Sequence, residues 1–223
     1  MIHSPDYDLA ATNAMKILRD QGISETPINP LPILEAVDGV RILPFTRMAT
    51  DAGIERQTLV PMFGYNQDAA TFHLNMQGFD NVKYVVVYNM RLPFDIVSRA
   101  IARELGHIVL GHDGTTRTRE ARMAEALCFA HHLLAPRPIL NLMIQSGMPL
   151  TQSALSETTG CSAECVVDMR RIPCAHVDGE LNRQVRDQFA PHIKEYIRFH
   201  LSSPMGDHSP VLDLGTFMDG YEE

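Results

Sequence analysis

The chain has 223 residues, of which 45% are hydrophobic and 21% are charged, and this balance is typical of a globular protein with a sizeable core. Its formal net charge of −8 at pH 7 argues against a nucleic acid or an anionic membrane surface as a partner. The sequence has no apolar run near the ~18 residues of a membrane span, and its start lacks a signal-peptide pattern. We therefore expect a cytoplasmic protein, in which the four cysteines stay reduced.

The first third of the chain predicts two helices and a strand. The first helix has Ser4 as its N-cap, and Gly22 stops it. A short helix capped by Asn29 then leads into a strand over residues 40–43. The two helices and the strand come before any residue with an evident chemical role.

Two further strands are predicted in the middle of the chain. Residues 46–70 have a weak pattern and contain an irregular strand around 59–65. The stretches ATFHLN (70–75) and KYVVVYN (83–89) are typical of strands, and the turn-rich QGFDNV lies between them. We expect these two strands to form a short antiparallel sheet.

Two long helices follow, over residues 94–111 and 119–134. In the first of them one apolar stripe runs along the helix at helical spacing, and Arg103 and His107 share another face with Glu104 beside it. The apolar stripe consists of Val97, Ile101, Leu105 and Ile108.

The stretch RELGHIVLGH (103–112) differs by one residue from the motif of a zinc peptidase, in which Arg103 would be His. Two ligands four residues apart on a helix converge on one ion, and a neighbouring carboxylate activates water. An R-E-x-x-H string is also common on a solvated helix face, where Glu pairs with Arg or His. The motif alone favours this second interpretation.

Three longer stretches change that balance, because together they resemble the ImmA/IrrE family of metallo-endopeptidases. They are AMKILRDQGISETPINPLPILEAVDGVRI, YVVVYNMRLPFDIVSRAIARELGHIVLGH and EARMAEALCFAHHLLAP, which follow the family's order over roughly residues 10–136. The resemblance implies an α+β fold, a small zincin-like domain with a short sheet. It also implies a zinc ion, and cleavage of a helix-turn-helix repressor of a phage, a mobile element or a stress regulon.

Carried over by resemblance, the general base is Glu104 and the zinc ligands are His107 and Glu125. Arg103 departs from the family pattern, because a guanidinium stays protonated and cannot ligate a metal. His112 is a possible substitute ligand if Gly111 ends the helix and turns it back. Alternatively, Arg103 replaces the metal by holding Glu125 and Glu104, which gives an inactive protein.

The remainder of the chain predicts a helical extension over residues 141–201 and an acidic tail over 202–223, after a peptidase domain over 1–140. Residues 150–172 resemble a helix-turn-helix with Gly160 in the turn, but acidic residues open its second helix. Three functions stay open: an altered zinc peptidase, an inactive relative that binds the same partner, and a DNA-binding regulator. We expect Cys161, Cys165 and Cys174 to be free thiols rather than a zinc cluster.

Overall fold

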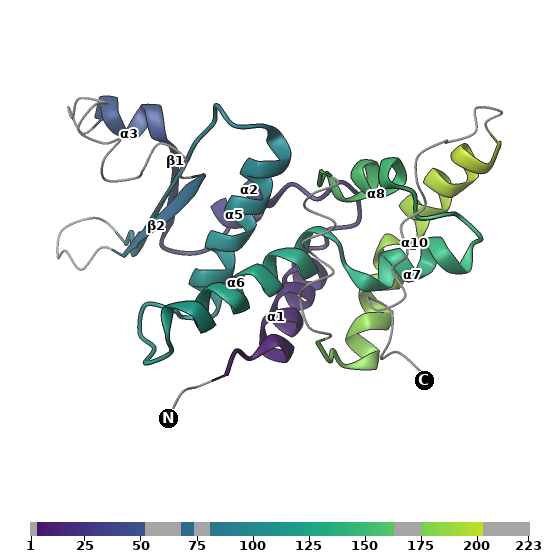
Figure 1. Ribbon diagram of the computed structural model, residues 1–223, viewed down its shortest axis with the longest axis horizontal. Coiled ribbons are helices and arrows are strands. Elements are labelled where there is room, and N and C mark those ends of the chain that lie inside the picture. The colour runs from purple at the N-terminus through teal and green to yellow at the C-terminus, as the bar shows by residue number, and fades with distance from the viewer. Residues whose placement is uncertain (1–3, 52–67, 74–80, 163–174, 203–223) are drawn as a thin grey trace.

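The computed structural model of the chain describes residues 4–51, 68–73, 81–162 and 175–202 (Figure 1). Within these ranges a small sheet lies at one end of the molecule, and helices make up the rest. The elements are α1 (Tyr7–Asp20), α2 (Pro30–Glu35), β1 (Val40–Pro44), α3 (Phe45–Asp51), β2 (Ala69–His73), β3 (Tyr84–Tyr88), α5 (Phe94–Val109), α6 (Arg119–Leu134), α7 (Arg137–Gln145), α8 (Gln152–Thr159) and α10 (Gly179–Ser202). The fold is therefore α+β, as expected.

The helix starts follow the capping chemistry of the sequence, with one correction. Asn29 caps α2 and accepts a hydrogen bond from the backbone N–H of Leu31 (3.1 Å). The cap of α1 is Asp6 rather than the predicted Ser4, because the Asp6 carboxylate accepts from the N–H of Leu9 at 3.0 Å. A carboxylate is also favoured at the positive end of a helix.

The three strands form one mixed sheet in the order β1-β3-β2. The predicted antiparallel pair is confirmed as β2 and β3, with Thr71 opposite Val86. The strand β1 adds to the other side of β3 in parallel. We predicted a purely antiparallel sheet, whereas the observed sheet is mixed. Helix α3, which directly follows β1, was also not predicted.

Helix α5 lies between the sheet and α6 (Figure 1). The residues of its predicted apolar stripe are buried or partly buried, with Leu105 inaccessible to solvent. The crossing with α6 is close: a Cβ added to Gly106 would lie 3.0 Å from the ring of Phe129. Gly106 therefore lets α6 approach the motif helix, and this brings residues of α6 to the site.

A single hydrophobic core joins α1, α5 and α6 to the later helices α7, α8 and α10. Phe129 of α6 and Phe189 of α10 are its largest buried side chains. Helix α10 runs through Pro191 without the expected interruption, and the alternative expectation of a kink there stays a prediction. The domain boundary near residue 140 stays a prediction.

The predicted helix-turn-helix segment falls only partly within the described residues. Its first helix is α8, which ends at Gly160 in the left-handed conformation (φ +68°). The residues predicted to form its second helix lie outside the described residues, as do those of the irregular strand predicted near 59–65 and the predicted tail after residue 202. In the described part of the chain, no helix combines the length and apolar character needed to cross a membrane.

Candidate functional site

The site begins at the C-terminal end of α5, where the chain turns back on itself. Gly111 has a φ of +63°, a conformation that glycine adopts without steric cost. Its N–H donates to the carbonyl of Ile108, and the N–H of His112 donates to the carbonyl of His107, both at 3.1 Å. This pair of hydrogen bonds is a Schellman motif, and it places His112 beside the last turn of the helix.

His107 and His112 are therefore neighbours, and Glu125 of α6 completes a row of three side chains. The two Nδ1 atoms lie 2.7 Å apart, and the Nε2 of His112 lies 2.9 Å from Oε2 of Glu125. Burial lowers the pKa of His107 to about 4, and it also lowers the pKa of His112 in spite of the nearby Glu125. Both imidazoles are neutral at pH 7, so one Nδ1 donates a proton and the other accepts.

Glu125 is almost completely buried and is held by three groups. Besides His112, its Oε1 accepts hydrogen bonds from the backbone N–H of Asp6 (2.7 Å) and from Nη1 of Arg117. Burial alone would raise the pKa of Glu125, but these hydrogen bonds outweigh it and hold the pKa below its usual value. Glu125 is therefore an ionised carboxylate at neutral pH.

Arg103 points away from Glu125, toward the start of β2. Its Nη1 and Nη2 donate to the two carboxylate oxygens of Asp68 at 3.1 and 2.9 Å, and Nη2 also donates to the Ala69 carbonyl at 3.3 Å. Nη2 and Nε donate to Oε1 of Glu104 at 2.7 and 3.1 Å. Burial alone would lower the pKa of Arg103, but the two carboxylates raise it above its usual value.

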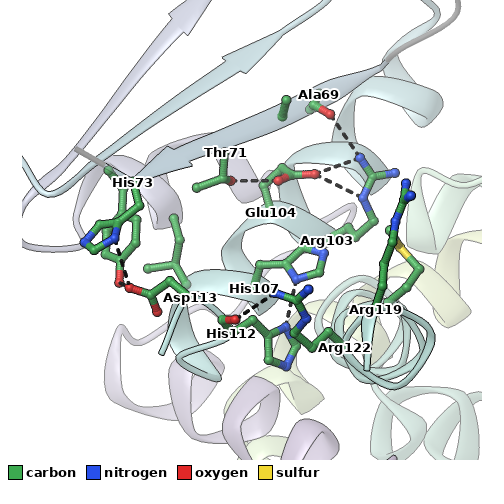
Figure 2. Close-up of a pocket in the computed structure, with 14 residues that line it drawn as sticks. Ala69, Thr71, His73, Arg103, Glu104, His107, His112, Asp113, Arg119 and Arg122 are labelled. Carbon is green, nitrogen blue, oxygen red and sulfur yellow. Dashed lines mark hydrogen bonds and ion pairs between the residues drawn. The ribbon is translucent and has the colours of Figure 1, made fainter. Parts of the chain in front are cut away.

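Glu104, the general base expected by resemblance, has both carboxylate oxygens occupied. Oε1 accepts from Arg103, and Oε2 accepts from the Thr71 hydroxyl at 2.7 Å (Figure 2). Only 5% of the residue is exposed. A general base must reach the proton that it removes, so this carboxylate would first have to leave the guanidinium.

One sequence prediction about these contacts is wrong. In the alternative in which it replaces the metal, Arg103 was expected to hold Glu125 and Glu104. The Glu104 contact is present, but the other partner is Asp68 and not Glu125. The turn at Gly111 places His112 against Glu125 instead, and the Arg103 side chain extends toward the sheet. Asp68 was missed because it lies in a weakly patterned stretch, where no local signal shows which carboxylate meets a distant arginine.

The site borders a cleft of about 370 Å³ between β2, α5 and the start of α6 (Figure 2). In the described part of the chain β2 is an edge strand of the sheet. The cleft is lined by Ala69, Ala70, Thr71, His73, Tyr84, Arg103, Glu104, His107, Ile108, His112, Asp113, Arg119, Arg122 and Met123.

The two histidines of α6 lie apart from the cleft. His131 and His132 are each 5% exposed, and burial lowers their pKa values to about 3 and about 4. His132 donates from Nδ1 to the carbonyl of Cys128 (3.0 Å), whereas neither ring nitrogen of His131 has a partner among the described residues. Both are core side chains.

Two cysteines lie within the described residues, and both are buried free thiols. Cys161 was predicted to be a buried thiol, and this is confirmed. Burial raises the pKa of Cys128 to about 12, so it is a thiol and not a thiolate. Cys165 and Cys174 lie outside the described residues.

The arrangement of donors does not fit a catalytic zinc ion. Such an ion takes three protein ligands and keeps one position open, but within the described ranges no three His, Cys, Asp or Glu side chains converge on one point. Two nitrogens bound to one zinc ion would lie about 3.3 Å apart. The Nδ1 atoms of His107 and His112 lie only 2.7 Å apart, which is a hydrogen-bonding distance. A carboxylate outside a metal site often only orients a histidine that binds the metal. If Glu125 has this role toward His112, only His107 and His112 are left as zinc ligands.

A comparison with family models places this site in a known type of domain. Residues 65–169 match the model described as the IrrE N-terminal-like domain. This span contains Asp68, the motif helix α5, and Glu125 of α6. No curated protein and no solved structure gives a significant match to the chain.

Proposed function

The chain carries an IrrE N-terminal-like domain, the metallopeptidase domain of the ImmA/IrrE family, and from this premise we propose that it binds a polypeptide partner without hydrolysing it. The partner class is a helix-turn-helix repressor. Support for this partner comes from the sequence resemblance, since the family acts on protein substrates. Support for the lost hydrolysis comes from the contacts of one residue, Arg103.

The observation that carries this proposal is the ion-pair cluster of Arg103. At the position of the first motif ligand, a permanently charged guanidinium pairs with Asp68 and with Glu104, the residue that would activate water. Its side chain is only 16% exposed, so solvent screens the charge weakly. A fixed positive charge repels a metal cation, and the same contact occupies the general base.

The cleft is suited to a polypeptide. The edge strand β2 provides four of its lining residues, Ala69, Ala70, Thr71 and His73. An extended peptide can add to such an edge through main-chain hydrogen bonds. Binding of this kind requires neither a metal ion nor a free general base, so it is compatible with the Arg103 cluster.

A second candidate function is an altered zinc peptidase in which His112 replaces the first ligand. The specific observation in its favour is the turn at Gly111, which brings His112 next to His107 and Glu125. This candidate requires the two imidazoles to leave their mutual hydrogen bond and turn toward one ion. It also requires Glu104 to separate from Arg103.

The two candidates differ in one assay. The probe is the helix-turn-helix repressor encoded nearest to the gene for this chain, incubated with the purified protein in the presence and absence of zinc. We expect the repressor to bind, as measured by calorimetry, and to stay intact on a denaturing gel. Cleavage that needs zinc and disappears in Glu104→Gln would instead establish the altered peptidase.

A further inference from the structure

Two arginines on the first turn of α6 line the cleft and have almost no protein partners (Figure 2). Arg119 is exposed and makes no hydrogen bond or ion pair with any described residue. Arg122 donates from Nη1 to the carbonyl of His112 at 3.0 Å. Its Nε is buried and has no hydrogen-bond partner within the described ranges.

The acidic residues of the cleft do not neutralise this pair. Glu104 is occupied by Arg103 and Thr71. The Asp113 carboxylate accepts from the Tyr84 hydroxyl at 3.0 Å and lies 3.5 Å from His73. Each carboxylate that lines the cleft therefore has other partners.

The positions of Arg119 and Arg122 are electrostatically unfavourable in the protein alone. Like charges three residues apart on a helix repel each other. The N-terminal end of a helix carries a partial positive charge, so cations there are disfavoured and anions are favoured. The buried Nε of Arg122 adds the cost of an unmade hydrogen bond. An anion bound by the two guanidiniums would relieve the first two of these penalties.

We propose that Arg119 and Arg122 bind the carboxylate of a Glu or Asp side chain in the polypeptide that occupies the cleft. This inference rests on the proposed function, because it names the kind of residue that the partner presents. A guanidinium donates two parallel hydrogen bonds to a carboxylate. A singly charged carboxylate suits the site better than a doubly charged phosphate, because Glu104 and Asp113 line the same cleft.

The test follows the arginine Nε–Hε signals by NMR in protein labelled with ¹⁵N-arginine. The probes are the tripeptide Ac-Ala-Glu-Ala-NH2, its Gln counterpart and inorganic phosphate. Arg119→Gln and Arg122→Lys assign the two signals. Arg119 makes no hydrogen bond or ion pair with any described residue, so its replacement removes none and should leave the fold intact. Arg198, whose side chain is 80% exposed on α10, is the control outside the cleft.

The Glu tripeptide should shift the Arg119 and Arg122 signals saturably and leave the Arg198 signal unchanged. Because a charge-assisted pair is lost, the Gln tripeptide should bind about tenfold more weakly. The absence of a saturable shift, or equal affinity for the two tripeptides, would overturn the inference. Tighter binding of phosphate than of the Glu tripeptide would overturn the choice of a carboxylate.

The repressor assay separates this inference from the proposed function. Arg119→Gln should weaken repressor binding about tenfold, and Arg198→Gln should not change it. If wild type and Arg119→Gln bind the intact repressor equally well, the carboxylate site is wrong and the proposed function stands. If the wild type cleaves the repressor, the proposed function fails, whatever the tripeptide titration shows.

Discussion

Arg103 and Asp68 form a two-point ion pair between the motif helix α5 and the residue that precedes β2. The two N–O distances are 3.1 and 2.9 Å, and the side chains are 16% and 22% exposed. The pair links the helix to the start of the strand β2, beside the cleft. In a zinc peptidase of this type the residue at position 103 would bind the metal, whereas here its side chain binds residues at the start of β2.

The first prediction concerns Asp68. Burial alone would raise the pKa of Asp68, but Arg103 outweighs it and lowers the pKa, so the pair stabilises the protein at neutral pH. That stabilisation is lost as the pH falls through the lowered pKa. Asp68→Asn should reduce the free energy of unfolding by roughly 1–3 kcal/mol, measured by urea denaturation.

The matched control for Asp68 is Asp187, which pairs with Arg186 on the exposed side of α10. Asp187→Asn should change the free energy of unfolding by less than about 0.5 kcal/mol. Equal effects of the two substitutions would mean that the Arg103 pair is as weak as an ordinary surface pair.

The second prediction distinguishes the observed partners of Arg103 from the one expected by sequence. Arg103→Met and Asp68→Asn should be coupled in a double-mutant cycle, by about 0.5–3 kcal/mol, because they remove the same contact. Arg103→Met and Glu125→Gln share no partner, so their effects should add within about 0.5 kcal/mol. Strong coupling between Arg103 and Glu125 would contradict the described geometry.

The third prediction tests the turn that places His112. A Cβ at Gly111 meets no atom within 4 Å, so Gly111→Ala costs only the strain of its φ of +63°, about 1–2 kcal/mol. Gly114, also in open space but without a positive φ, is the control, and Gly114→Ala should be nearly neutral. Thermal unfolding of both variants measures the difference; equal melting temperatures would argue against the turn.

The fourth prediction uses the buried His131. Burial lowers its pKa from 6.5 to about 3, so between these values the unfolded chain binds a proton that the folded protein does not. The folded state therefore loses stability as the pH falls. Because of His131 alone, the free energy of unfolding should fall by about 2 kcal/mol between about pH 7 and about pH 5. His131→Leu should remove this loss. The exposed His176, replaced by Gln, is the control, and parallel pH curves for all three proteins would refute the prediction.

Local patterns in the sequence were sufficient for most elements of the fold. The stripe of Ile101 and Leu105 predicted which face of α5 is buried, and the strands β2 and β3 were predicted as an antiparallel pair. The parallel pairing of β1 with β3 was not predicted, because the alternation of apolar and polar residues within a strand does not specify which strand lies beside it. The cap of α1 was misplaced by two residues, since Ser4 and Asp6 are both good caps.

The candidate site was predictable only in part. The spacing of Arg103, Glu104 and His107 on one helix showed that these residues lie together, and Gly111 indicated how His112 could return. The partner of Arg103 depends on a contact between residues 35 positions apart. Only the fold brings Asp68 there, through the pairing of β2 with β3 and the packing of α5 on the sheet.

The zinc content of the purified protein tests the central claim most directly. The protein is expressed with zinc in the medium, purified without a metal-binding tag, and analysed by mass spectrometry for metal per chain. Because Arg103 repels a cation and leaves too few ligands, the wild type should carry well under one zinc per chain. Arg103→His restores the first motif ligand and should bind about one. About one zinc per wild-type chain, lost in His107→Ala, would contradict this account and favour a peptidase with His112 as its substitute ligand.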